Sequence, residues 1–239
     1  MIVPSRPYRY AALAIVVAAV AVAAVVGARV MIRETPRLGA ATNLDELGVY
    51  GRVPPFSLVE RSGRRVTADA LRGSVWIVDF IYTECTDSCP TQSLQFAQLQ
   101  REFAAEEDFR LVSITVDPTH DTPEVLSAYA HRYAATDRWW FLTGDTGTIY
   151  CLARDGFRLG VIDVRVSDPP QCGAVSWLSP ASAWASHVSQ GLVMHSARVV
   201  LVDRNGRIRA YHVATDERSM TALRTNLKSL LSEAPGPAR

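Results

Sequence analysis

Three features of the sequence predict an α/β domain with a central mixed sheet and helices on both faces. Apolar runs rich in β-branched and aromatic residues occur at 74–82 and 109–117, and such runs are typical of buried strands. Each run is followed by a segment of helical character, at 90–106 and 122–134. Near the C-terminus, two extended segments flank the short turn "RNG" and precede a last helix. Parallel β-α-β units followed by an antiparallel hairpin make the predicted sheet mixed.

The remaining elements are predicted from turn and cap residues. "FSLVE", "RSGRR" and "VTADALRG" read as a hairpin with its turn at Ser62-Gly63. Pro90 and Pro123 stand where a first helical turn tolerates proline, and Thr122 is the expected N-cap. "RWWFLTG" predicts a short strand, "TGTIYCLARDG" a short helix that ends at Gly156, and "FRLGVIDVRV" an extended segment.

Composition excludes several classes of protein. The 239 residues carry a net charge of +1 and no basic run, so we expect no nucleic-acid partner. With 48% hydrophobic residues, the chain can bury a hydrophobic core large enough to stabilise a domain. Four cysteines are too few for a disulfide-built scaffold. Chemistry is therefore the better explanation for the closely spaced cysteines.

The N-terminal region predicts a membrane anchor. An uncharged apolar run fills residues 11–28 and has arginines on both sides. As a helix it spans about 27 Å, close to the hydrocarbon thickness of a bilayer. A cleaved signal peptide is the alternative, because "VGA" at 26–28 could serve as a cleavage site. The predicted divisions are listed here: tail 1–10, transmembrane anchor 11–32, linker 33–49, domain 50–233 with an inserted loop at 167–191, and tail 234–239.

Cys85 and Cys89 lie four residues apart where the first buried strand meets the first helix. Amides of a first helical turn and the helix dipole favour negative charge, so we predict lowered thiol pKa values there. Thiolates attack disulfides and also bind metals. The pair can therefore be a thiol catalyst, half of a metal site or, because cysteine is often buried, an inert core pair.

Four motifs in order resemble the Sco/SenC family of membrane-anchored, thioredoxin-like copper proteins. They are "DFIYTECTDSCP", "VSITVDPTHDTPEVLSAYA", "WWFLTGD" and "HSARVVLVDRNGRI". The resemblance covers about residues 50–232, apart from 167–191. It implies a thioredoxin-like fold and one copper ion, Cu(I) or Cu(II), per chain. It also implies a role in building the dinuclear copper centre of cytochrome c oxidase subunit II.

Carried onto this chain, the resemblance implies that Cys85, Cys89 and His195 are the copper ligands. Two thiolates and an imidazole suit Cu(I) and tolerate Cu(II), whereas zinc normally takes a fourth ligand. The other histidines are expected to be surface or structural residues: His120, His131, His187 and His212.

Two departures from the family pattern leave questions open. Met194 stands where the family has an acidic residue before the histidine, and it is either a weak axial ligand or a buried apolar side chain. The insertion, which carries Cys172, could shield the site, contact a partner or form a disulfide with Cys151. The alternative, in which Cys151 and Cys172 are two unrelated thiols and the insertion has no functional role, is the one we favour.

Three aspartates are further candidates. Asp79, six residues before Cys85, either accepts the proton of a reacting thiol or bonds to backbone amides. Its burial on a strand would favour the protonated form. Asp117 and Asp121 match the family's acidic loop. We take Asp117 as the accessory site candidate. The alternative is that Asp117 ends a strand and Asp121 caps the helix at Pro123.

A copper metallochaperone is the predicted function, with no certain turnover chemistry. A thiol-disulfide oxidoreductase that keeps the acceptor's cysteines reduced is the alternative, and a copper or redox sensor is a third possibility. The anchor and the resemblance together imply a single-pass protein of the inner membrane with its domain in the periplasm. That compartment is oxidising, so we also expect a periplasmic thiol reductant as partner.

Overall fold

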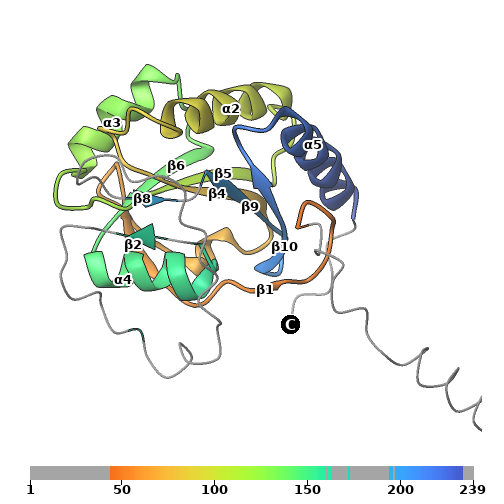
Figure 1. Cartoon of the computed structure of the whole chain (residues 1–239), viewed down its shortest axis with the longest axis horizontal. Helices are drawn as coiled ribbons and strands as arrows, with labels where there is room; N and C mark the ends of the chain where they lie inside the picture. Colours follow the sequence, from red (N-terminus) through yellow and green to blue (C-terminus); the bar gives the residue numbers. More distant parts are fainter. Residues whose placement is uncertain (1–43, 160, 163–171, 173–193, 196, 234–239) are drawn as a thin grey trace, which may run out of the picture. The chain divides into compact units, whose positions relative to one another are not determined.

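The computed structural model describes residues 44–159, 161–162, 172, 194–195 and 197–233. These residues lie in one compact unit, Leu44–Arg239 (Figure 1). Within them no helix is both long enough and apolar enough to cross a bilayer. The apolar run at 11–28, which predicts the anchor, and most of the insertion at 167–191 lie outside the described residues.

A mixed eight-stranded sheet forms the centre of the unit, in the order β1-β10-β9-β4-β5-β6-β2-β3. Strands β4, β5 and β6 run parallel, and the other neighbours pair antiparallel. The strands are β1 (Gly51–Arg52), β2 (Ser57–Glu60), β3 (Arg65–Thr67), β4 (Val75–Ile81), β5 (Phe109–Thr115), β6 (Trp139–Thr143), β9 (Arg198–Val202) and β10 (Arg207–Val213). The predicted mixed sheet is confirmed.

Helices follow the strands where the sequence predicts them. They are α2 (Cys89–Glu102), α3 (Pro123–Arg132), α4 (Thr146–Cys151) and α5 (Glu217–Ser232), with a short 3-10 turn at Ala68–Leu71 and a π-helical turn at Leu152–Gly156. Thr122 caps α3 as predicted, because its hydroxyl accepts a hydrogen bond from the Val125 amide. Gly63 and Gly206 have φ values of +84° and +73°, which explains glycine at both hairpin turns.

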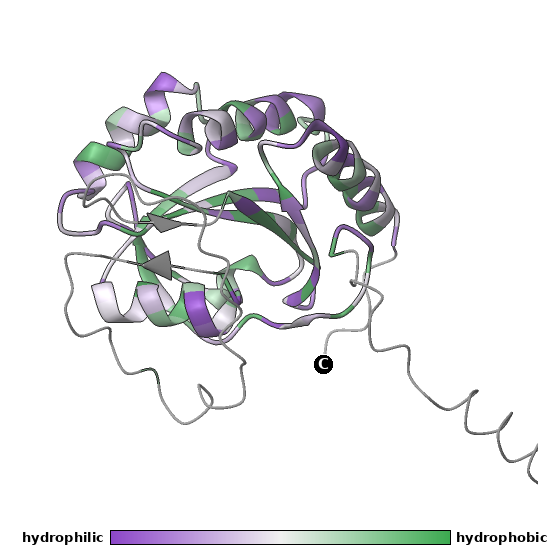
Figure 2. Ribbon diagram, in the orientation of Figure 1, coloured by the Kyte–Doolittle hydropathy of each residue, from purple (hydrophilic) through white to green (hydrophobic). Residues whose placement is uncertain are grey.

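The central strands are buried on both faces. Every residue of β4 is buried, and Figure 2 shows hydrophobic residues concentrated in the sheet. Phe96 of α2 packs on Trp139, on one face of β6. Phe157, after the π-helical turn, packs edge-on against Trp76 and Phe80 of β4.

Register places these two contacts on opposite faces of the sheet. Ile77 of β4 aligns with Leu111 of β5, which aligns with Trp139. Side chains alternate along a strand, so odd-numbered residues of β4, Asp79 among them, face α2. Even-numbered residues face Phe157. Figure 1 shows α2 and α4 on opposite sides of the sheet, as the predicted architecture requires.

The structure adds three pairings that the sequence does not predict. β1 forms one edge of the sheet beside β10. Residues 44–49, part of the predicted linker, also bind β10, since the Leu44 carbonyl accepts from the Tyr211 amide and the Gly48 amide donates to Arg209. Finally, β7 (Val161–Ile162) and β8 (Met194–His195) form a separate two-stranded sheet.

Candidate functional site

The cysteine pair lies at the junction of β4 and α2. β4 ends at Ile81, and α2 begins at Cys89 with Pro90 in its first turn. The intervening loop exposes Glu84, Thr86 and Asp87 to solvent. The loop itself is therefore at the surface, as its polar sequence predicts.

Both cysteine side chains nevertheless point inward. Cys85 is 8% exposed and Cys89 is fully buried. They carry thiols rather than a disulfide, and the Cys89 thiol is hydrogen-bonded to Cys85. The two sulfur atoms thus converge at one point, which a shared metal ion and an internal disulfide both require.

Burial raises the pKa of the Cys89 thiol far above its usual value. Desolvation is the largest cause, and the hydrogen bond to Cys85 and the charges of Cys85 and Asp79 act in the same direction. The Tyr82 amide donates to the sulfur and opposes them. The lowered pKa predicted for this thiol is therefore wrong. A first-turn position favours thiolate only where the sulfur remains solvated, and here the packing of α2 on the sheet removes it from water.

Tyr82 is a candidate site residue that the sequence alone does not single out. Its side chain is 6% exposed, and its hydroxyl is hydrogen-bonded to the Cys85 sulfur. Desolvation raises the pKa of Tyr82, and the nearby Cys85, Cys89 and Asp87 add to the effect. The phenol therefore stays protonated and can donate to a sulfur anion. In the sequence Tyr82 looks like the last residue of an apolar strand.

Asp79 lies beneath the pair on the face of β4 that α2 covers. Its side chain is fully buried, and it is close enough to Cys89 for its charge to raise the thiol pKa. Asp79 therefore occupies the buried position before the cysteines that the sequence predicts for it.

A buried carboxyl group ties the cysteine loop to the loop after β5. Asp121 is fully buried and accepts hydrogen bonds from the Thr83 amide and hydroxyl and from the Thr115 hydroxyl. The alternative in which Asp121 caps α3 is wrong, because Thr122, the expected N-cap, takes that role. Asp117, the predicted accessory residue, is half-buried, and its amide donates to the Thr115 hydroxyl.

The histidines whose side chains are described take different roles. His120 hydrogen-bonds to Asp121 at 2.9 Å and lies 3.3 Å from Glu84. The bond to Asp121 raises the pKa of His120. His131 is exposed on α3, and His212 is fully buried in β10. His187 lies outside the described residues.

The backbone of the predicted histidine ligand is described. In the two-stranded sheet His195 pairs with Val161, and Met194 pairs with Ile162. Among the side chains that the structure describes, no three His, Cys, Asp or Glu residues gather into a metal site. Those of Met194 and His195 are outside that set.

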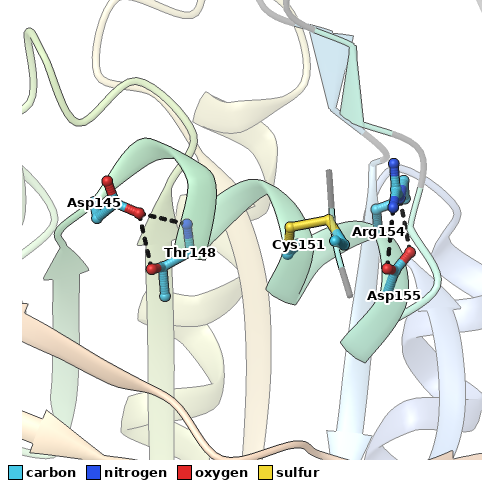
Figure 3. The surroundings of a disulfide bond; sticks show 6 residues. Asp145, Thr148, Cys151, Arg154 and Asp155 are labelled. Carbon is cyan, nitrogen blue, oxygen red and sulfur yellow. Dashed lines mark hydrogen bonds and ion pairs between the residues drawn. A yellow bond between two sulfur atoms is a disulfide. The ribbon is translucent and has the colours of Figure 1, made fainter. Parts of the chain in front are cut away.

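Cys151 and Cys172 form a disulfide (Figure 3). The predicted alternative of two unrelated thiols is therefore wrong, and the disulfide is the arrangement observed. The bond joins the end of α4 to the insertion, and Figure 3 shows it between the Asp145–Thr148 cap and the Arg154–Asp155 ion pair. Because α4 lies on the opposite side of the sheet from α2, which begins at Cys89, the disulfide and the Cys85–Cys89 pair lie on opposite faces of the sheet (Figure 1).

Comparison with protein families gives a match to the SCO1/SenC model over residues 48–173. A SCO1 homologue of Bacillus subtilis is 39% identical over 94 residues, which cover 38% of this chain and 49% of that protein. A candidate copper-binding protein of Stutzerimonas stutzeri is 30% identical over 66% of this chain and 68% of its own length. The chain thus matches about half the length of the Bacillus relative.

Solved structures of similar fold come from the same group. A SCO1/SenC family lipoprotein of Bacillus anthracis superposes with a TM-score of 0.60 at 25% identity, covering 75% of this chain and 94% of the other. BsSco, described as a cytochrome c oxidase assembly protein with a disulfide switch, gives 0.59 at 25% identity over 79% and 98%. These likenesses confirm the predicted thioredoxin-like fold.

Proposed function

The chain belongs to the SCO1/SenC family, and from this premise we propose that it is a copper metallochaperone. Its acceptor would be the dinuclear copper centre of cytochrome c oxidase subunit II. The observation that carries the proposal is the convergence of two reduced, buried cysteines at the start of α2. The similarity to a candidate copper-binding protein and to an oxidase assembly protein supports it.

Cys85, Cys89 and His195 are the proposed ligands of the copper cargo. Thiolates are soft ligands that favour Cu(I), and imidazole also accepts Cu(II). The raised pKa of Cys89 has a chemical consequence, because a protonated thiol must lose its proton to bind metal. Loading this site should therefore release protons, and Asp79 is the proposed acceptor of the Cys89 proton. Met194 and Asp117 are proposed accessory residues.

A thiol-disulfide oxidoreductase is the second candidate function. The hydrogen bond between Cys89 and Cys85 favours it, because sulfurs already in contact can form an internal disulfide without a large rearrangement. In this reaction the pair would give two electrons and two protons to an acceptor disulfide. A copper or redox sensor would use the same pair.

We propose a single-pass inner-membrane location with the domain in the periplasm. The support is the apolar run at 11–28, the lipoprotein character of a structural relative and the oxidase assembly role of another. The proposed anchor is 11–32, followed by a linker from 33 and a domain that ends at 233. Residues 44–49, predicted as the end of the linker, belong with the domain because they hydrogen-bond to β10. A periplasmic reductant would keep Cys85 and Cys89 as thiols.

Copper titration of the full chain tests the chaperone. The Cys85–Cys89 pair is reduced, and Cu(I) is added in competition with a chelator of known affinity. Cu(II) is added separately, and its thiolate absorption is recorded. We expect one copper per chain, loss of Cu(I) binding in Cys89→Ser, and loss of the Cu(II) band in His195→Ala.

His131→Ala is the matched control, because His131 is an exposed histidine of α3. It should bind copper like the wild type. A chain that binds no copper, yet reduces a disulfide-containing acceptor peptide through Cys85 and Cys89, would identify the oxidoreductase as the correct function.

A further inference from the structure

The Cys151–Cys172 disulfide closes a loop that contains one strand of the β7–β8 sheet. Its two cysteines are 21 residues apart in the sequence. Strand β7 lies between them, and its partner β8 carries the proposed ligand His195. The two backbone pairs of the β7–β8 ladder therefore connect the disulfide loop to the proposed copper ligand His195.

The Cys151 end of this loop is firmly held. Asp145 caps α4 by accepting from the Thr148 amide at 2.8 Å and the Thr148 hydroxyl at 2.9 Å (Figure 3). After Cys151, the Phe157 amide donates to Leu152, and the Phe157 ring is fully buried.

The same anchor reaches the strand that leads to the cysteines. Phe157 packs edge-on against Phe80, with ring centroids 5.6 Å apart. Phe80 belongs to β4, five residues before Cys85. The fixed end of the disulfide loop and the cysteine junction therefore share one core.

The β7–β8 ladder itself is very short. It consists of the pairs Val161–His195 and Ile162–Met194. A two-stranded ribbon is marginally stable in water without further constraint. A disulfide that closes the loop containing β7 lowers the conformational entropy that this loop loses when the ladder forms.

We propose that the Cys151–Cys172 disulfide is a positioning element for His195. By closing the loop it holds β7 in place, and β7 sets the backbone position of His195 through the Val161 pairing. This inference rests on the proposed function, in which His195 is a copper ligand. The two cysteine pairs then have opposite redox requirements, because copper retention needs Cys85 and Cys89 reduced but Cys151 and Cys172 joined in a disulfide.

A double-mutant cycle on the full chain tests the coupling. Both cysteines are replaced together (Cys151→Ala with Cys172→Ala), so that neither can mispair with Cys85 or Cys89. Cu(I) affinity is measured by chelator competition in the wild-type and His195→Ala backgrounds. We expect the double replacement to weaken binding about tenfold, as for groups that orient metal ligands. In the His195→Ala background the same replacement should change affinity by less than about twofold.

Asp216→Ala is the matched structural control. Asp216 caps α5 by accepting from the Arg218 and Ser219 amides, so its loss lowers the melting temperature but leaves the disulfide loop untouched, and copper affinity should not change. If removing the disulfide weakens copper equally in both backgrounds, the effect is general destabilisation and the inference is wrong. If His195→Ala weakens binding while disulfide removal does not, the inference is wrong and the proposed ligand set stands. If His195→Ala has no effect on copper affinity, the proposed ligand set and the positioning role of the disulfide are both wrong.

Two further measurements do not depend on the double variant folding. The wild type is reduced anaerobically with dithiothreitol, which is then removed. The chain is prepared with two titratable thiols, Cys85 and Cys89, or with four, when Cys151 and Cys172 are also reduced. The four-thiol form should bind Cu(I) about tenfold more weakly. In the metal-free chain, the backbone amides of β7 and β8 should exchange with deuterium faster in the four-thiol form. Equal affinity and equal exchange would overturn the proposal.

Discussion

Asp121 holds the loop that carries Cys85 through Thr83, whose amide and hydroxyl donate to the two Asp121 carboxyl oxygens at 3.1 and 2.5 Å. A third bond, from the Thr115 hydroxyl, joins the end of β5 to the same carboxyl. Since Asp121 and Thr83 are both buried, water cannot replace these bonds. The cysteine loop is therefore fixed from outside its own strand and helix.

Replacing Asp121 with alanine should destabilise the protein and loosen the cysteine loop. The change leaves three buried donors without their acceptor, and each unsatisfied group costs about 1–3 kcal/mol, so we expect a loss of roughly 3 kcal/mol or more. Urea unfolding measures the loss, and alkylation of Cys85 should become faster. Thr122→Ala, which removes the neighbouring α3 cap, should cost only about 1 kcal/mol and leave alkylation unchanged. Equal alkylation rates in the two variants would contradict this role.

Replacing Tyr82 with phenylalanine should slow the reactions of Cys85. The substitution keeps the buried ring and removes the hydroxyl that is hydrogen-bonded to the sulfur. A hydrogen bond to a charged group contributes about 1.5–3 kcal/mol, so alkylation at fixed pH should slow roughly tenfold or more. Mass spectrometry of the Cys85 peptide follows the rate.

Tyr129→Phe provides the matched control for Tyr82. Tyr129 is also a buried tyrosine, but its hydroxyl is hydrogen-bonded to Ser93 at 2.9 Å. Its removal should lower stability without slowing the alkylation of Cys85. A comparable slowing in both variants would assign the effect to general loosening of the core.

The sheet and the cysteine junction were predictable because their signals are local. A continuous apolar run such as β4 has no polar face to expose, so it must be a central strand. Pro123 after Thr122 identifies the start of α3 from two adjacent residues. Cys89 follows from the same logic, since Pro90 places it at the beginning of a helix.

The environment of the site was not predictable because it depends on contacts across the chain. Asp121 meets Thr83 over a sequence separation of 38 residues, and no local pattern distinguishes it from the adjacent cap residue. The raised pKa of Cys89 depends on how closely α2 packs on the sheet. Tyr82 has the residue type of a core strand, and only the fold brings its hydroxyl to Cys85.

Replacing Asp79 with asparagine separates its electrostatic effect from its proposed proton-accepting role. The charge of Asp79 raises the pKa of Cys89, so its removal should lower that pKa and let the thiolate form at lower pH. The pH profile of Cys89 alkylation should therefore shift towards lower pH. If Asp79 also accepts the Cys89 proton, the variant should load copper more slowly than the wild type when both are compared at the same thiolate fraction. An unshifted profile together with normal loading would remove Asp79 from the site.

His212 should make the folded domain less stable in mild acid. Its imidazole is fully buried in β10, and burial lowers its pKa from 6.5 to about 4, although Asp45 lies 3.6 Å away and opposes the shift. An unfolded chain binds a proton below pH 6.5, whereas the folded chain does so only below about pH 4. Stability is therefore complete above pH 6.5 and falls as the pH decreases to about 4, by roughly 3 kcal/mol from this residue.

Urea unfolding of the wild type and His212→Gln between pH 7.5 and pH 4 measures this contribution. Carboxyl groups titrate in both proteins, so the difference between the two curves isolates His212. The variant should be less stable at pH 7, because glutamine does not reproduce the shape of the buried ring, but its stability should fall less steeply below pH 6.5. Parallel curves would mean that folded and unfolded His212 titrate at the same pH. That result would contradict the lowered pKa of the buried imidazole.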